Sequence, residues 1–327
     1  MLTSLKLAQL KHLAVQCGLN SSGTKTIVAT RLEELMQARK PVTTRNCTKQ
    51  VMREKPVRIL SIDMGIRNLA YCILETPIPS KPNSVPPPSP SILAWKRIAI
   101  APRMSDAVSS TDPLSDPAGK SKENFEPATY ASHAYALLSK VLLPHAPTSI
   151  LIERQRYRSM GSSAILEWTV RVNMLEGMLY AVLRTLHEEG KWNGTVEGVS
   201  PARVTSFWVG DTKVEQTTRT AKTAKAKSKG AKIDLVGAWL RAGDTVRFKD
   251  GEARQTRDAF LQKWSGEGRR RAKIKTSAVT DTELQAGTEE EIGKLDDLAD
   301  CLLQAMAHVR WQENRQKLIE GNVDSLM

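Results

Sequence analysis

The chain has 327 residues, and its 48 Lys and Arg residues outnumber its 35 Asp and Glu residues, giving a formal net charge of +13. This length suits one large domain or two ordinary ones, and the excess positive charge favours a polyanionic partner, by default nucleic acid. The four cysteines form no C-x-x-C pair, which argues against a zinc site or a disulfide framework, and no apolar run is long enough for a membrane helix or a secretory signal. A soluble protein without a membrane partner is expected.

Residues 1–38 show two helical periods separated by a glycine-containing turn. The first period runs from Leu7 to Cys17 and stops at Gly18, a typical C-terminal cap, and the second runs from Ile27 to Leu35. A leucine-rich helix, the letters GL, the turn NSSGTK and a second helix ending in RLEEL resemble the SAP module, a small all-α unit that binds DNA. The resemblance implies DNA-backbone contacts from the turn residues Ser22, Gly23, Thr24 and Lys25. The alternative is an accessory helical pair packed on the main domain.

Residues 39–56 are polar and basic, which indicates a linker, so a main domain over residues 57–327 is predicted. The expected elements are, in chain order, strands 58–63, 67–75 and 91–100, helix 130–143, strand 148–153, a long helix 162–189, strand 195–200, helix 201–208, a basic stretch, and a final helix 292–318. Composition marks 76–90 and 101–127 as insertions without regular structure. This order predicts an α/β domain whose mixed sheet is flanked by helices.

Acidic residues stand at three places within apolar sequence. Asp63 ends the first strand, and Glu153 ends the strand TSILIE. Asp296, Asp297 and Asp300 lie in the final helix, where spacings of three and four residues place two of them on one face. Each position taken singly is explained by a turn cap, an ion pair or a solvated helix face. Converging carboxylates repel one another unless a cation lies between them, so the set predicts a divalent-metal site, for which Mg²⁺ is the natural ion.

Three stretches carry a more specific resemblance. LSIDMGIRNLAYCILE, ILIERQRYRS and KLDDLADCLLQA, in this order, resemble the Holliday-junction resolvases of the RNase H-like superfamily, RuvC and above all the fungal mitochondrial resolvases, over residues 57–310. The resemblance implies an RNase H-like sheet, a homodimer, mitochondrial residence, and metal-dependent cleavage of a four-way DNA junction. It also implies two Mg²⁺ ions per active site, for which Mn²⁺ can substitute.

Carried onto this chain, the resemblance implies a catalytic set of Asp63, Glu153 and a pair within Asp296, Asp297 and Asp300. The RuvC spacing favours Asp297 with Asp300, whereas a spacing of four would use Asp296, and the sequence leaves this choice open. The implied metal ligands are Asp63, Glu153, Asp297 and Asp300.

Candidates for DNA contact lie in the turn after Asp63, beside Glu153, and in basic segments near residues 213–232 and 269–275. In an already cationic chain such segments favour phosphate contacts, and Tyr157 can stack on an unpaired base. Gly65 permits a tight bend in this turn, where Arg67 and Asn68 can approach the substrate or steady the turn. Outside the first module the candidates are Arg67, Asn68, Arg154, Gln155, Arg156, Tyr157, Arg158, Lys222, Lys225, Lys227, Lys229, Arg269, Arg270 and Arg271.

The long helix after Glu153 carries apolar residues at alternating steps of three and four from Ile165 to Leu186, the pattern of a heptad seam. The seam can pack on the sheet as core or be shared across a two-fold dimer, and the sequence leaves both possibilities open.

Other functions compete with junction cleavage: a transposase or flap nuclease of the same superfamily, and a non-catalytic DNA-binding protein. IDMGIRN also resembles the first phosphate loop of actin-like ATPases. The sequence has no second loop of the D-x-G-[TS] type, and DPAGKS lacks the first glycine of a P-loop, so no nucleotide cofactor is expected.

Overall fold

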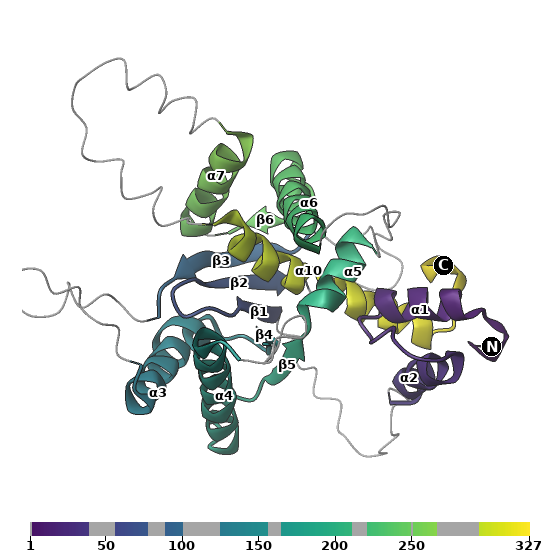
Figure 1. Ribbon diagram of the computed structural model, residues 1–327, viewed down its shortest axis with the longest axis horizontal. Coiled ribbons are helices and arrows are strands. Elements are labelled where there is room, and N and C mark those ends of the chain that lie inside the picture. Colours follow the sequence, from purple (N-terminus) through teal and green to yellow (C-terminus); the bar gives the residue numbers. More distant parts are fainter. Residues whose placement is uncertain are drawn as a thin grey trace, which may run out of the picture.

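A mixed sheet of six strands forms the centre of the fold in the computed structural model, which describes residues 2–38, 56–77, 89–100, 125–155, 165–210, 221–249, 251–266 and 294–327 (Figure 1). The strands are β1 (Val57–Asp63), β2 (Leu69–Thr76), β3 (Ser91–Ile98), β4 (Ser149–Glu153), β5 (Thr195–Val199) and β6 (Arg247–Phe248), in the order β5-β4-β1-β2-β3-β6. β2 runs antiparallel to β1 and β3, whereas β4 runs parallel to both β1 and β5. The predicted strands are confirmed with small changes of bounds.

The parallel pairing of β1 and β4 brings two acidic residues together. Ile62 pairs with Ile152 in the register, so Asp63 and Glu153 leave the sheet at the same edge. β1 is apolar on both sides because both faces of the sheet are covered: Ile59 belongs to one core cluster and Leu60 to the other. The sheet therefore places both strand ends, with their carboxylates, beside each other.

Helices cover both faces of this sheet (Figure 1). One face carries α3 (Pro127–Ala136), which continues through a π-helical turn over Leu137–Leu142, and α4 (Glu167–Glu188). The other face carries α5 (Pro201–Val209), α6 (Ala221–Ala242), α7 (Gly251–Ser265) and α10 (Leu295–Ile319). Within the described residues no helix is both long and apolar enough to cross a membrane. The predicted helix-flanked α/β sheet is confirmed.

The basic stretch before the final helix, to which the sequence analysis assigned no helix or strand, is followed closely by regular structure. That region contains α6, β6 and α7, since its lysines alternate with alanines of high helix propensity and its second half is apolar on one side. Val236 and Leu240 of α6 and Phe260 of α7 are buried in the core that α10 shares. The predicted insertions over 76–90 and 101–127 lie mostly outside the described residues.

The apolar seam of α4 packs mainly on the sheet. Val172, Leu175 and Leu179 are buried in the core cluster beneath it. At the start of the helix, however, Ile165 and Trp168 keep 41% and 38% of their surface exposed. The seam is thus core over most of its length, and its first turn is exposed.

The N-terminal hairpin consists of α1 (Leu7–Gln16) and α2 (Lys25–Ala38), as predicted, and it packs on the end of α10 (Figure 1). Its buried leucines share a cluster with Leu318, Val323 and Leu326. Gly18 ends α1 with φ +66°, and a Cβ atom there would lie 2.3 Å from the Trp311 ring. Glycine is required at this position both for the cap and for the close approach of α10.

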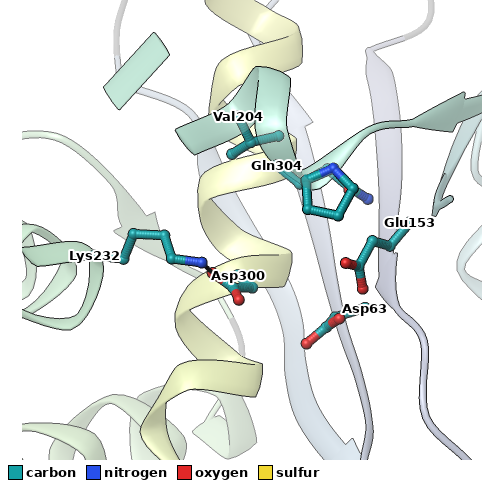
Figure 2. Close-up of a pocket in the computed structure, with 7 residues that line it drawn as sticks. Asp63, Glu153, Val204, Lys232, Asp300 and Gln304 are labelled. Carbon is teal, nitrogen blue, oxygen red and sulfur yellow. Dashed lines mark hydrogen bonds and ion pairs between the residues drawn. The ribbon is translucent and has the colours of Figure 1, made fainter. Parts of the chain in front are cut away.

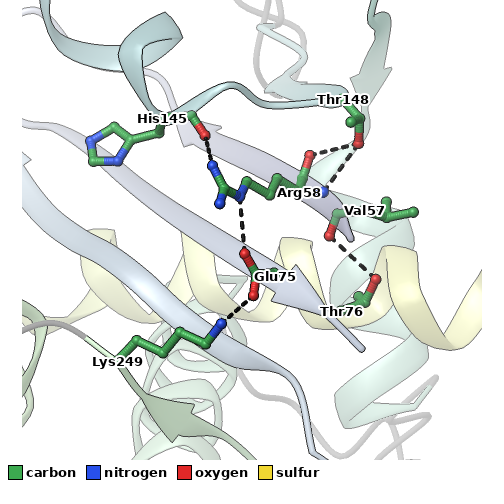
Figure 3. A network of polar contacts seen from close by, with 7 residues as sticks. All are labelled: Val57, Arg58, Glu75, Thr76, His145, Thr148 and Lys249. Atoms are coloured by element: carbon green, nitrogen blue, oxygen red, sulfur yellow. Dashed lines mark hydrogen bonds and ion pairs between the residues drawn. The ribbon is translucent and has the colours of Figure 1, made fainter. Parts of the chain in front are cut away.

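An ion-pair network holds the sheet together at the start of β1 and the end of β2, the strand ends that lie away from Asp63 (Figure 3). The Arg58 guanidinium donates to Glu75 at 3.0 Å and to the backbone carbonyl of His145 at 2.8 Å. Glu75 also pairs with Lys249, which follows β6. These contacts tie the start of β1 to the end of β2, the β6 segment and the loop before β4.

Candidate active site

Three acidic residues from three elements line one small cavity (Figure 2). Asp63 comes from the end of β1, Glu153 from the end of β4, and Asp300 from the second turn of α10. The cavity measures about 20 Å³, enough for a water-sized occupant. The residues that line it are Asp63, Glu153, Pro201, Val204, Lys232, Asp300 and Gln304. The strand-end carboxylates predicted from sequence therefore converge with the acidic face of the last helix.

The carboxyl group of Asp63 is the most perturbed of the set. Burial, a hydrogen bond with Glu153 and the negative charges of Glu153, Asp300 and Asp297 together raise its pKa well above the usual value. A divalent cation among these acidic side chains would relieve their mutual repulsion, and their all-oxygen donor set fits a hard metal ion.

Each aspartate of α10 contacts a different basic side chain. Asp296 pairs with Lys229, Asp297 accepts a hydrogen bond from the Arg97 guanidinium at 3.1 Å, and Asp300 pairs with Lys232. In the part of the chain that the structure describes, no three acidic, His or Cys side chains are close enough to hold one ion as they stand. A metal ion held by three of these acidic groups would need some of their side chains to move.

The environments of these aspartates differ. Burial opposes ionisation of Asp296, but the hydrogen bond and charge of Lys229 outweigh it and lower the pKa. Burial raises the pKa of both Asp297 and Asp300, despite their basic partners. The charges of Asp297 and Asp300 also raise the pKa of Asp63. Asp300 lines the cavity, whereas Asp296 and Asp297 do not, so the cavity lining leaves open which of these two acts with Asp300.

Gln304 is a structural residue of the site that the sequence analysis missed. Its side chain is buried under the cavity, and its amide nitrogen lies 3.0 Å from Ser61 Oγ, 3.3 Å from the Ile62 carbonyl and 3.4 Å from the Leu151 carbonyl. It thereby joins α10 to β1 and β4 just before their terminal carboxylates. The signal in the sequence is a lone glutamine in the apolar run of the final helix, four residues after Asp300.

The turn between β1 and β2 is held against the site by Arg97, a second residue that the sequence analysis missed. Arg97 on β3 donates to both Asp297 and the Asn68 side chain. A Cβ atom on Gly65 would lie 2.7 Å from the Asn68 carbonyl oxygen, which confirms that the turn is tight. The hydrogen bond from Arg97 shows that Asn68 steadies the turn. Arg67 is exposed instead, and its guanidinium lies over the Trp168 ring, 4.9 Å from the ring centroid.

Several of the predicted DNA contacts fall on residues that the structure describes. Arg154, directly after Glu153, lines a hollow of about 490 Å³ together with Asn20 and Ser21 of the α1–α2 connection. The backbone N–H of Gln155 donates to Glu176 at 3.1 Å. Ser22, Gly23, Thr24 and Lys25 are exposed in the same connection. Helix α6 carries Lys222, Lys225, Lys227 and Lys229. Arg156, Tyr157, Arg158, Arg269, Arg270 and Arg271 lie outside the described residues.

Comparison with known proteins finds a matching family model and two similar fungal proteins. Residues 59–318 match the family model described as mitochondrial resolvase Ydc2 / RNA splicing MRS1. A cruciform cutting endonuclease 1, mitochondrial, of Schizosaccharomyces pombe is 28% identical over 95% of this chain and 94% of its own. The protein of the same name from Saccharomyces cerevisiae is 25% identical over 96% of this chain and 84% of its own.

A solved structure has the same fold. The crystal structure of the yeast mitochondrial Holliday junction resolvase Ydc2 superposes with a TM-score of 0.56, covering 98% of this chain and 99% of that one at 24% identity. This likeness shows that the chain shares the fold of that structure.

Proposed function

The chain belongs to the mitochondrial resolvase Ydc2 / RNA splicing MRS1 family, and we propose that it is an endonuclease that resolves four-way DNA junctions in mitochondria. Both curated relatives are named as mitochondrial cruciform cutting endonucleases, and each aligns over nearly the whole of this chain. The proposal specifies the reaction as phosphodiester hydrolysis on two strands of the junction.

The observation that carries the proposal is the convergence of Asp63, Glu153 and Asp300 in one cavity at the edge of the sheet. The family's description joins a resolvase with an RNA-splicing protein, so membership by itself leaves cleavage and nucleic-acid binding both open. A protein that only binds a polyanion gains nothing from carboxylates that face it, because they repel phosphate. The acidic cavity within a strongly basic chain therefore favours cleavage.

The residues that would hold divalent ions are Asp63, Glu153, Asp297 and Asp300. Bound Mg²⁺, as a pair of ions, would supply an activated water and stabilise the leaving 3′ oxygen. The contribution of the chain is to fix the carboxylates: Gln304 holds both strand ends to α10, and Arg97 ties the neighbouring turn to Asp297. Mn²⁺, which accepts the same oxygen ligands, would serve as a substitute.

DNA would reach the cavity along the hollow between Arg154 and the α1–α2 connection. Arg154 is exposed next to Glu153, so its guanidinium is placed to bind a phosphate of the strand being cut. Replacing Arg154 with Ala should weaken junction binding and reduce the slope of log affinity against log salt by about 0.9, the share of one phosphate contact on a duplex. An unchanged slope would show that this side chain does not contact phosphate.

Symmetric cleavage of a four-way junction calls for two active sites, and we place the dimer contact at the start of α4. Leu166 and Val170 there expose 73% and 50% of their surface, beside the half-exposed Ile165 and Trp168. Such an apolar patch on a cationic protein suits a second copy of the chain. Sedimentation of the DNA-free protein at micromolar concentration should give a dimer, and Leu166→Glu should give a monomer.

The decisive experiment incubates the protein with a synthetic four-way junction, a flap and a plain duplex, with Mg²⁺ and with EDTA. We expect paired nicks in the junction alone, and only with the metal. Asp63→Asn should abolish the nicks and keep junction binding near wild type, because binding comes from the basic surface. Binding without cleavage by the wild type would favour a nucleic-acid-binding protein, and cutting by Asp63→Asn would refute the site.

A further inference from the structure

Lys232 brings a positive charge into the carboxylate cavity (Figure 2). Its ammonium group lies 2.5 Å from Asp300 Oδ1, and its side chain is 12% exposed. Burying an ammonium group is costly unless a negative partner compensates. The position of Lys232 is therefore explained by the carboxylates that it faces, and it places a cation at the wall of the candidate metal site.

The other two pairs on α10 are arranged differently. Lys229, one turn earlier on α6, contacts Asp296 outside the cavity, and its side chain is 46% exposed. Arg97 contacts Asp297 while also holding the turn between β1 and β2. Among the residues that line the cavity, Lys232 is the cationic one.

We infer that Lys232 is an internal counter-ion of the candidate metal site, which neutralises Asp300 until a divalent ion displaces it. This inference rests on the proposed function, since it takes Asp63, Glu153 and Asp300 as metal ligands. The Asp300 carboxylate faces away from the other two acids and toward α6 while Lys232 holds it (Figure 2). An incoming divalent ion must therefore compete with the ammonium group for the same carboxylate.

The competition has two linked consequences. The ion pair stabilises the metal-free protein, because it compensates a partly buried carboxylate next to Asp63 and Glu153. The same ion pair lowers the affinity for the divalent ion, because the ion must break it in order to bind Asp300. The binding free energy of the ion is the difference between the metal-bound and metal-free protein, and the ion pair stabilises only the metal-free protein. Lys232 thus keeps the acidic cavity folded without metal and makes metal binding weaker than the carboxylates alone would allow.

The test measures metal binding without DNA, so its readout is separate from cleavage. Mn²⁺ is titrated calorimetrically into the wild-type protein and into Lys232→Met, which keeps most of the length of the side chain and removes its charge. We expect the dissociation constant to fall at least about tenfold, which corresponds to about 1.4 kcal/mol. The melting temperature without metal should fall, and the rise on adding Mn²⁺ should be larger than in the wild type.

Lys229→Met is the matched control, because it removes the same charge from the same helix outside the cavity. The dissociation constant of Lys229→Met for Mn²⁺ should stay within about twofold of the wild-type value. This is well below the change of about tenfold, or about 1.4 kcal/mol, that is expected for Lys232→Met. Lys232→Gln, which can still donate a hydrogen bond to Asp300, should tighten Mn²⁺ binding in the same direction and serves if the methionine variant does not fold.

Unchanged or weaker binding in both Lys232 variants would overturn the inference and leave the proposed function standing. Equal tightening in Lys229→Met would overturn it too, since general charge would then be the cause. If Asp63→Asn binds Mn²⁺ as the wild type does, the ion binds elsewhere, and both the inference and the proposed metal site fail.

Discussion

Replacing Gln304 with Met tests whether one buried amide positions the active-site carboxylates. The substitution keeps a side chain of similar length and removes the donor that contacts Ser61 and the carbonyls of Ile62 and Leu151. Leaving such buried groups unsatisfied costs about 1–3 kcal/mol. A loss of this size should lower the melting temperature by roughly 2–10 °C.

The same change should slow cleavage, because the strand ends carrying Asp63 and Glu153 lose their fixed distance from α10. A displacement of about 1 Å can cost about a hundredfold in rate, so we expect single-turnover cleavage of a saturating junction to fall tenfold to a hundredfold. Gln316→Met is the control: its amide donates to Glu320 at 2.7 Å on the exposed side of the same helix. Loss of that surface contact should change the stability by less than about 0.5 kcal/mol.

Wild-type stability in Gln304→Met would show that the three contacts add nothing to folding. Reduced stability with wild-type cleavage would refute the positioning role, since the carboxylates would then be held by other contacts. Only a joint fall in melting temperature and single-turnover rate, absent from Gln316→Met, agrees with the reasoning.

Two further substitutions probe parts of the fold away from the cavity. Gly18→Ala should lower the free energy of unfolding by about 3 kcal/mol or more, because it combines left-handed backbone strain with a clash against Trp311. The control is Gly190→Ala: Gly190 also has a positive φ, +67°, but no neighbour within 4 Å, so its replacement should lower the free energy of unfolding by only about 1 kcal/mol. If Gly18→Ala and Gly190→Ala lose the same free energy of unfolding in chemical denaturation, the close approach of α10 to Gly18 is contradicted. The pKa of Glu75 lies below its usual value of 4.5, mainly because of the hydrogen bond with Lys249. This ion pair therefore stabilises the folded state at neutral pH, and its contribution is lost as the pH falls through the lowered pKa of Glu75. Glu75→Gln should therefore melt below the wild type at pH 7, and the difference should shrink as pH drops below 4.5; a gap that stays constant with pH would assign the effect to packing instead.

Elements with a strong local signal could be predicted from the sequence. β1 and β4 are short apolar runs that end in a carboxylate, and such runs form buried strands wherever helices cover both faces. Asp63 and Glu153 were singled out because each ends an apolar strand, and Asp300 because helical spacing groups it with Asp296 and Asp297. The structure brings Asp63, Glu153 and Asp300 to one cavity, as the sequence analysis expected.

Features that depend on pairing between distant elements could not be predicted. Arg97, Lys232 and Gln304 reach the site from β3, α6 and α10, and nothing in their local sequence indicates which carboxylate or strand they contact. Helix α6 was missed because its many lysines dominate its composition, although alanines between them favour a helix. The packing of the N-terminal hairpin on the C-terminal residues likewise joins parts of the chain that no short-range pattern connects.

That packing sets an order for folding during synthesis. The hairpin is synthesised long before the partners of its buried leucines, Leu318, Val323 and Leu326. Until those residues are made, the apolar sides of α1 and α2 lack this cover. Contacts of such sequence separation form slowly, and the waiting surface is prone to association with other chains. Nascent chains stalled before residue 318 should therefore need a chaperone that the finished protein does not.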